Sequence, residues 1–162
     1  MIRVERATVA AYDAVHRMMR DTWEDTYGSY FTAEQLPEAR RLWLDALPLE
    51  SALSDPRLFF LLAWEATTLL GFVAAQLLDS NDLFLLRVYV HPAYQRRRVG
   101  TLLVNQAVTA FPDASAIRLD VEEGNARGVA FWKEQAFQET GRRRMTVAGV
   151  SISLISMEKH LA

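Results

Sequence analysis

Residues 88–101 read VYVHPAYQRRRVGT, and they decide how the rest of the chain is interpreted. An apolar run typical of a strand ends at His91 and Pro92, a polar bend follows, and an amphipathic helix is predicted over residues 102–111. The first N–H groups of a helix have no partner within it and lie at the positive end of its dipole. A diphosphate can therefore bind there, Gly100 lets the backbone approach it, and the arginines add forked donors.

Three consecutive arginines also fit a solvated surface, so the neighbouring segments decide between an anion site and a surface turn. Residues 83–90 predict the strand that enters the bend, and residues 117–121 predict the next strand. Because a helix lies between them, these strands are expected to be parallel, with a right-handed crossover. Residues 57–64 and 69–78 are apolar runs that predict an antiparallel pair before them, with a bulge near Gly71.

Two helices are expected between the first strand, residues 2–5, and this sheet. Thr8 is the predicted N-cap of the first helix, and Gly28 follows its last turn. Thr32 and Gln35 fit a capping box for the second helix.

The C-terminal part predicts one more helix and a hairpin. Asn125 is a suitable N-cap for a helix that runs to Ala136. Gly128 lies inside that helix at a cost of roughly 1 kcal/mol relative to alanine, so either the loss is tolerated or something packs closely there. Residues 138–147 and 150–158 predict a terminal antiparallel hairpin.

The resulting order, β-α-α-β-β-β-α-β-α-β-β, and two motifs carry a resemblance to a known family. Residues 95–100, QRRRVG, resemble the Q/R-x-x-G-x-G/A signature of the GNAT superfamily, the acyl-CoA-dependent N-acyltransferases. Residues 119–125, LDVEEGN, with the later FW and AF pairs, are similar to its L-x-V-x-x-x-N…F-Y-x-x-x-G-F segment. The chain departs from these patterns at Arg98, Trp132 and Ala136, where the family has glycine, tyrosine and glycine. A side chain at Arg98 is expected to require a negative φ.

This resemblance covers essentially the whole chain and implies its fold class. The expected structure is α/β (α+β), with a mixed, mostly antiparallel sheet of about seven strands flanked by about four helices. A central parallel strand pair is part of that expectation. We expect one acyltransferase domain over residues 1–162.

Composition and charge narrow the possible functions. The chain has 18 Lys and Arg against 20 Asp and Glu, a net charge of −2, whereas nucleic-acid-binding domains are more often strongly basic. The lack of cysteine excludes disulfides and a thiol nucleophile, and the histidines show no metal-ligand spacing. The start lacks the apolar core of a signal peptide, and no apolar run approaches ~18 residues, so a cytoplasmic protein is expected.

The resemblance implies acetyl-CoA as co-substrate and a primary amine as acceptor. In this family the strand backbone binds the pantetheine arm and the turn cradles the pyrophosphate. The residues that the resemblance assigns to acetyl-CoA are Val88, Tyr89, Val90, Gln95, Arg96, Arg97, Arg98, Val99, Gly100, Thr101, Asn125 and Phe131.

Two positions are candidates for the chemistry. Asp120 stands where some family members carry a carboxylate base, although an outward-facing aspartate is an equally good interpretation. Glu122 points the same way by strand alternation and is the second candidate. Phe84 occupies the place of the glutamate that many members carry on the preceding strand. Trp132 replaces the tyrosine thought to protonate the leaving thiolate, and indole cannot act as a general acid.

Trp23 and Tyr27 resemble a Trp-x-x-x-Tyr pattern that some family members carry at the end of the first helix. They are candidates for the acceptor site, with core packing as the alternative. The acceptor is either a small-molecule or a protein amine, and neither nucleic acid nor membrane is an expected partner. A homodimer is expected from the apolar residues of the last strand, with burial inside one chain as the alternative.

Two other function classes compete with an active enzyme. Arg98 and Trp132 at family positions would also fit a degenerate GNAT domain that binds acyl-CoA as a sensor without catalysis. A nucleic-acid-binding module would use the arginine triplets, but the net charge argues against it.

Overall fold

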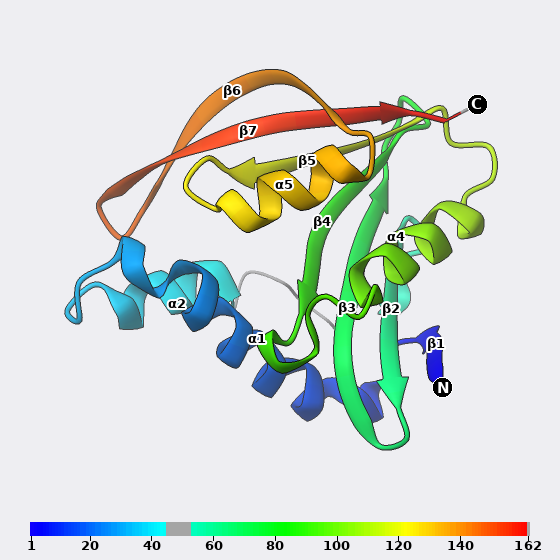
Figure 1. Ribbon diagram of the computed structural model, residues 1–162, viewed down its shortest axis with the longest axis horizontal. Helices are drawn as coiled ribbons and strands as arrows, with labels where there is room; N and C mark the ends of the chain where they lie inside the picture. Colours follow the sequence, from blue (N-terminus) through cyan, green and yellow to red (C-terminus); the bar gives the residue numbers. More distant parts are fainter. Residues whose placement is uncertain (45–52, 162) are drawn as a thin grey trace.

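One seven-stranded sheet runs through the computed structural model, which describes residues 1–44 and 53–161 (Figure 1). Its strand order is β1-β2-β3-β4-β5-β7-β6, and all neighbouring strands are antiparallel except β4 and β5. The expected mixed sheet with a parallel pair is therefore confirmed. The strands are β1 (Ile2–Arg6), β2 (Leu58–Glu65), β3 (Thr68–Leu77), β4 (Leu83–Val90), β5 (Ala116–Glu122), β6 (Gln138–Val147) and β7 (Val150–His160).

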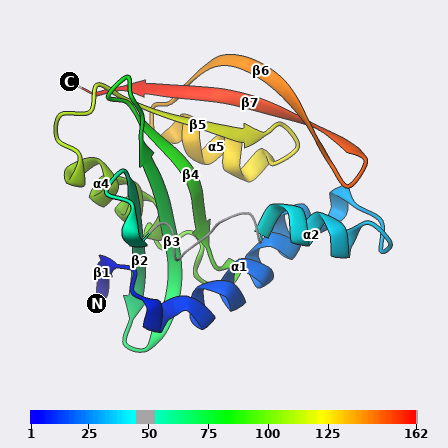
Figure 2. The same cartoon turned by 180° about the vertical axis from the view of Figure 1, so that it is seen from behind.

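Helices cover both faces of this sheet (Figures 1 and 2). Phe72 of β3 packs in the core beneath α1 and α2, whereas the neighbouring Val73 packs beneath α4, as strand alternation requires. In the described part of the chain, none of the helices is long and apolar enough to span a membrane. The helices are α1 (Tyr12–Tyr27), α2 (Leu36–Leu44), α4 (Val99–Ala110) and α5 (Ala126–Glu134).

The parallel strands β4 and β5 touch at one end only. Leu83 pairs with Ile117 and Phe84 with Arg118, and these two pairs form the vertex from which the strands diverge (Figure 1). Beyond the vertex, β4 stays paired with β3 as far as Val90, and β5 stays paired with β7. Within the described residues, the edges of β4 and β5 that face each other therefore lack a strand partner. Their backbone groups can bind an extended ligand.

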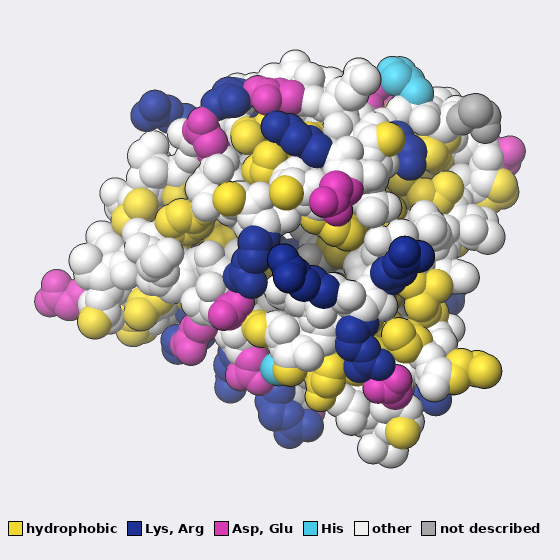
Figure 3. Space-filling view, viewed as in Figure 1, with side chains coloured by type: hydrophobic (Ala, Val, Ile, Leu, Met, Phe, Trp, Pro, Cys, Tyr) yellow, Lys and Arg dark blue, Asp and Glu magenta, His cyan; other side chains and the backbone are white. Residues whose placement is uncertain are grey.

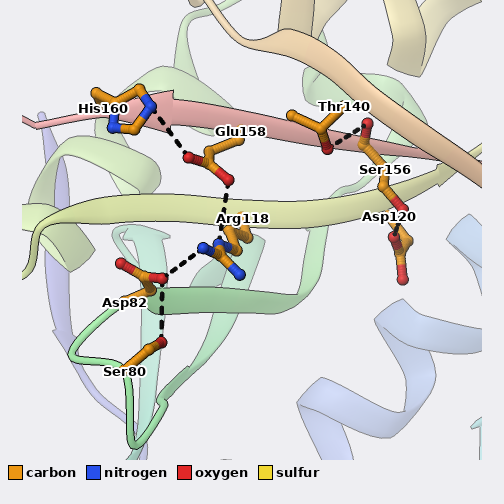
Figure 4. Close-up of polar contacts among 8 residues, drawn as sticks. All are labelled: Ser80, Asp82, Arg118, Asp120, Thr140, Ser156, Glu158 and His160. Carbon is orange, nitrogen blue, oxygen red and sulfur yellow. Dashed lines mark hydrogen bonds and ion pairs between the residues drawn. The ribbon is translucent and has the colours of Figure 1, made fainter.

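A polar network braces the vertex (Figure 4). The Nη2 atom of Arg118 lies 2.9 Å from Oδ2 of Asp82, which also accepts a hydrogen bond from the Ser80 hydroxyl at 3.0 Å. The Nε atom of Arg118 lies 3.2 Å from Glu158 of β7, whose other oxygen is 3.1 Å from His160. Asp82 is buried, so its carboxylate depends on these partners. The network ties the start of β4 to β5 and β7.

A bulge lies in β4 just after the vertex. The adjacent residues Ala75 and Ala74 of β3 pair with Leu85 and Arg87, so Leu86 is one residue too many for the ladder. An extra residue moves every later side chain of a strand to the opposite face of the sheet. The sequence gives no alternation from which this shift could be predicted.

The bulge decides which β4 side chains face α1. Leu85, before the extra residue, packs in the core beneath α4, whereas Tyr89 packs in the core beneath α1. Arg87 also reaches the α1 side, where its Nη2 atom donates to the carbonyl oxygen of Trp43 in α2 at 2.7 Å. Two polar side chains of β4 are thereby brought to the same side of the sheet.

Several local predictions are confirmed. Thr32 and Gln35 form the reciprocal bonds of a capping box, at 2.9 and 3.3 Å, and Gly28 follows α1 directly. Asn125 caps α5 by accepting from the N–H of Gly128 at 3.0 Å. A Cβ at Gly128 would lie 2.5 Å from Nδ2 of Asn125, so close packing is the reason for glycine there.

Two other local predictions are wrong in detail. Thr8 makes no capping hydrogen bond through its side chain, and a 3₁₀ turn over Val9–Ala11 precedes α1. Helix α4 begins at Val99 instead of residue 102, because residues of the basic bend already form its first turn. The helix therefore starts directly beside the arginines.

The apolar residues of β7 lie inside the chain. This strand runs between β5 and β6, and Ile152, Leu154, Ile155 and Met157 are buried. The alternative of burial within one chain is therefore correct for these side chains, and they offer no surface for self-association. A homodimer stays a prediction without this support.

We predict that Asp82→Asn lowers the free energy of unfolding by about 1–3 kcal/mol, because Arg118 and Ser80 lose a charged partner at a buried position. Thermal or denaturant unfolding would measure this. Asp79→Asn is the matched control, since Asp79 is almost fully exposed in its pair with Arg57 and should change stability by less than about 0.5 kcal/mol. Equal effects of the two substitutions would contradict the bracing role of Asp82.

Candidate active site

Five polar side chains meet on the α1 side of the diverging strands. They are Glu122 from the end of β5, Arg87 and Tyr89 from β4, and Tyr27 and Tyr30 from the end of α1 and the turn after it. They lie close enough together for the charge or the hydroxyl of one residue to shift the pKa of another. We call these residues the splay cluster. It places a carboxylate, a guanidinium and three phenols around one opening in the sheet.

Glu122 is the acidic member of the splay cluster and is 8 % exposed. Burial raises the pKa of Glu122 above its usual value. Hydrogen bonds from the backbone, the Tyr27 hydroxyl and the Asn125 side chain, with the charge of Arg87, oppose this rise without cancelling it. The carboxylate is therefore held in place and has a stronger affinity for a proton than an exposed glutamate.

The tyrosines of the splay cluster stay protonated. Burial, followed by the charges of Tyr89 and Glu122, raises the pKa of Tyr27 well above its usual value. Burial likewise raises the pKa of Tyr89 to about 12, although the nearby charge of Arg87 lowers it. Burial also raises the pKa of Tyr30, whose ring lies against Gly124. All three phenols can donate hydrogen bonds at neutral pH.

The basic turn before α4 contains two left-handed arginines. Arg96 has φ of 65° and Arg98 has φ of 62°, so the expectation of a negative φ at Arg98 is wrong. Left-handed residues in a turn direct successive backbone N–H groups to one side, which makes a concave anion site. The turn therefore has a conformation that glycine adopts without strain, and two arginines hold it at a local cost.

The first turn of α4 lies open to an anion. Arg98 caps this helix without a side-chain hydrogen bond, so no side chain of the cap occupies the first N–H groups. A Cβ at Gly100 would lie 3.2 Å from the ring of Phe131, so this glycine also lets α5 pack against α4. The residues present therefore fit a diphosphate group. The donors would be backbone N–H groups, helped by exposed guanidinium groups.

A bridge joins the turn, α5 and α1. The Nη1 atom of Arg127 lies 3.2 Å from Oε1 of Gln95, and its Nη2 atom lies 3.1 Å from Oδ2 of Asp25. Gln95 in turn donates to the carbonyl oxygen of Val90 at 3.2 Å. Figure 3 shows Lys and Arg side chains gathered beside a hollow on this face, between the starts of α4 and α5. The face suits a ligand with several phosphates.

Asp120 is engaged elsewhere. One oxygen of its carboxylate lies 2.7 Å from Nη2 of Arg143, and the other accepts from the Ser156 hydroxyl at 2.7 Å (Figure 4). It lies two residues before Glu122 on the same side of β5 and does not belong to the splay cluster. Its role as a base stays a prediction, and its surroundings are those of a structural ion pair.

The aromatic candidates divide between the hydrophobic core and the splay cluster. Trp23 is fully buried and stacks on Phe31, so it belongs to the core, whereas Tyr27 reaches Glu122. Trp132 is buried between Phe131 and Phe137 on the opposite, α5 side of the sheet. Phe131 is only partly buried and borders the first turn of α4.

Comparison with known proteins decides the family, because the model of the acetyltransferase (GNAT) family matches residues 13–137. The chain belongs to the GNAT acetyltransferase family. As a GNAT acetyltransferase, it moves an acetyl group from acetyl-CoA to an amine, so this part of the expected function is confirmed.

Individual relatives of this GNAT chain are distant. Spermidine N(1)-acetyltransferase of Thermoplasma acidophilum is 23% identical over 143 residues, which are 85% of this chain and 88% of the relative. The crystal structure of the PaiA N-acetyltransferase of Thermoplasma acidophilum with coenzyme A has a TM-score of 0.82, 22% identity and 99% coverage of both chains. The ribosomal-protein-S18-alanine N-acetyltransferase of Escherichia coli has a TM-score of 0.72 and 16% identity, covering 100% of this chain and 95% of its own. These structures share the fold.

The sequence did not reveal two side chains of the splay cluster. Arg87 was not a candidate, and Tyr89 was assigned only through its backbone. Both depend on the bulge at Leu86, which the residue pattern does not reveal. Glu122 was the second carboxylate candidate, and strand alternation from Asp120 was the signal for it.

We predict that Arg98→Gly raises the free energy of unfolding by about 0.5–1 kcal/mol. Relief of the left-handed strain, ~1–2 kcal/mol, exceeds the entropy that glycine adds to the unfolded chain, ~0.4–1 kcal/mol. Affinity for coenzyme A should fall by less than tenfold, since only one exposed charge is lost. Unfolding and calorimetry measure both quantities. Arg97→Gly is the control, because its φ is not positive and glycine should destabilise there. A less stable Arg98→Gly variant would contradict the interpretation that the left-handed backbone at Arg98 is strained.

Proposed function

We propose that this enzyme acetylates a primary amine by direct attack in a ternary complex, with Glu122 accepting the proton that the amine loses. The observation that supports this most is a buried carboxylate of raised pKa at the open end of the β4–β5 splay. A base works best when its pKa approaches the working pH, and burial moves a glutamate in that direction. The amine nitrogen then bonds to the acetyl carbon, the carbon–sulfur bond breaks, and coenzyme A leaves as the thiolate.

The acetyl-CoA residues expected from the sequence keep their assignment in this proposal. The pantetheine arm lies along the unpaired edge of β4, formed by the backbone of residues 88–90, as an added strand would. Its diphosphate occupies the turn over residues 95–101. Asn125 and Phe131 border the arm from α5. Rate acceleration then comes from alignment of the two substrates and from oriented donors.

Trp132 supports the leaving group without protonating it. Its ring N–H can donate a hydrogen bond but does not ionise in a useful pH range. Because a thiol has a pKa near ~8.5, the thiolate leaves readily at neutral pH and solvent can supply its proton. Trp132 packs against Phe131 and Phe137, which fits a wall of the thioester pocket.

The class of acceptor amine and the cellular compartment are also proposals. One relative is named for spermidine, and one structural neighbour is named for an alanine of a ribosomal protein. The acceptor is therefore either a small-molecule amine or a protein amine, and both should be assayed. Tyr27 borders the amine beside Glu122.

A single domain over residues 1–162 is supported by the sheet, which takes strands from both ends of the chain. The lack of cysteine supports a cytoplasmic setting.

A binding-only GNAT domain is the second candidate, and Arg98 and Trp132 at family positions favour it. The left-handed φ of Arg98 weakens the argument from that residue, because the turn keeps its anion-binding shape. An assay of coenzyme A release with a panel of amines separates the two candidates. Binding of acetyl-CoA without turnover on any amine would favour the sensor.

We predict that Glu122→Gln lowers kcat by ~10²-fold or more while acetyl-CoA still binds, as expected for the loss of a general base. The base must be ionised, so the rate of the unmutated enzyme should fall as the pH drops through the raised pKa of Glu122. That acidic limb should disappear in the variant. Asp120→Asn is the matched carboxylate change on the same side of β5. The Asp120 hypothesis predicts the opposite ranking, so a larger loss in Asp120→Asn would overturn the assignment.

A further inference from the structure

The hydroxyl of Tyr89 is buried in the splay cluster and meets full hydrogen-bond geometry with no described residue, and its one polar side-chain neighbour within looser reach is the Arg87 guanidinium. Tyr89 is 6 % exposed, and its hydroxyl lies near enough to Tyr27 and Glu122 for their charges to interact. A buried hydroxyl without a partner makes a folded chain less stable than phenylalanine would at the same place. Because it lies in the splay cluster beside Glu122, this hydroxyl can bond to a group that arrives with a substrate.

Arg87 provides a second donor on the same side of β4. One of its nitrogens is used by the carbonyl oxygen of Trp43, and its charge acts on both Tyr89 and Glu122. A guanidinium has five N–H donors, so one bond to Trp43 leaves donors for a ligand. The splay cluster thus combines one carboxylate with one guanidinium. It carries no net charge at the place where the acceptor amine must stand.

We propose that Arg87 and Tyr89 form a second recognition point of the acceptor site, which binds an oxygen atom next to the reacting amine. The acceptor carries a carboxylate or an amide carbonyl on the carbon beside its amine, as a free α-amino acid or a peptide N-terminus does. Its oxygen accepts from the Tyr89 hydroxyl and the Arg87 guanidinium, while its amine faces Glu122. This inference rests on the proposed function, because the amine must first stand beside that base.

The same arrangement disfavours polyamines. At neutral pH a polyamine carries a positive charge on each of its nitrogens. One ammonium group can face Glu122, but the next one meets Arg87 instead of a second carboxylate. Like charges repel strongly where water is excluded, so Arg87 selects against such acceptors.

Tyr89→Phe tests the recognition point through stability. The variant should melt at the same or a higher temperature than the unmutated enzyme, because among the described residues the hydroxyl has only a loose contact with Arg87 to lose. Tyr12→Phe is the control, since Tyr12 is an exposed tyrosine at the start of α1. A lower melting temperature for Tyr89→Phe alone would show that the hydroxyl stabilises the chain, and it would overturn the proposal.

The second readout is kcat/KM, calculated for the unprotonated amine, on alaninamide and on sec-butylamine. Both acceptors have a methyl-bearing carbon beside the amine, and sec-butylamine carries an ethyl group where alaninamide carries its carboxamide. We expect alaninamide to be favoured by ~10-fold or more, and we expect Tyr89→Phe to remove most of that ratio. Tyr12→Phe should keep the ratio. Equal kcat/KM values for the two acceptors, or an unchanged ratio in Tyr89→Phe, would overturn the proposal.

Arg87 is tested with charged acceptors. Arg87→Gln should raise kcat/KM for spermidine relative to alaninamide and lower it for free alanine, whereas Arg87→Lys, which keeps the charge, should preserve the order. No change in either ratio would refute the role of Arg87.

A preference for alanine indicates a free amino acid, and a preference for an alanine-initiated peptide indicates a protein N-terminus, both within the proposed chemistry. If no amine is acetylated, the proposed function fails, and calorimetry of alaninamide against sec-butylamine with coenzyme A still decides recognition.

Discussion

The site depends on parallel strands that are joined at one end only. Two residue pairs hold β4 to β5, and Asp82, Arg118 and Glu158 brace that vertex from one side. Each strand keeps its other neighbour, so the sheet stays continuous while a gap opens in its middle. Backbone groups along the gap are left without a strand partner, so an extended ligand can pair with them as a strand would. The opening is therefore a property of the sheet and exists before any substrate binds.

The bulge at Leu86 determines the chemistry on each side of that opening. Without the extra residue, Arg87 and Tyr89 would face α4, and their polar groups would lie in the aliphatic core there. With it, they stand beside Glu122, and the α4 side receives the apolar Val88 and Val90. One insertion in a ladder thus separates a polar acceptor side from an apolar side where Trp132 packs.

The fold was predictable because its signals are local. Strand ends, the Thr32–Gln35 capping box and the Asn125 cap each depend on a few neighbouring residues. The site was less predictable because it depends on distant partners. Asp120 and Glu122 share one side of one strand, and only Arg143 beside the first and Tyr27 beside the second distinguish them. Arg98 was interpreted wrongly for a related reason, since the left-handed region is uncommon for residues with a side chain.

Three costly features of the chain lie where the substrates are proposed to bind. Left-handed arginines strain the turn, a buried carboxylate has a raised pKa, and the Tyr89 hydroxyl has no well-formed hydrogen bond to a described residue. Glycine, glutamine or phenylalanine would each remove one of these costs without changing the fold. Strain and unsatisfied groups persist where the surrounding structure holds them, and here the two cores on either side of the sheet do so. In the proposed function, each cost would be offset by one ligand group: a diphosphate at the turn, an ammonium at Glu122 and an oxygen at Tyr89. These three positions therefore match the anionic, cationic and hydrogen-bond-accepting groups of the two proposed substrates.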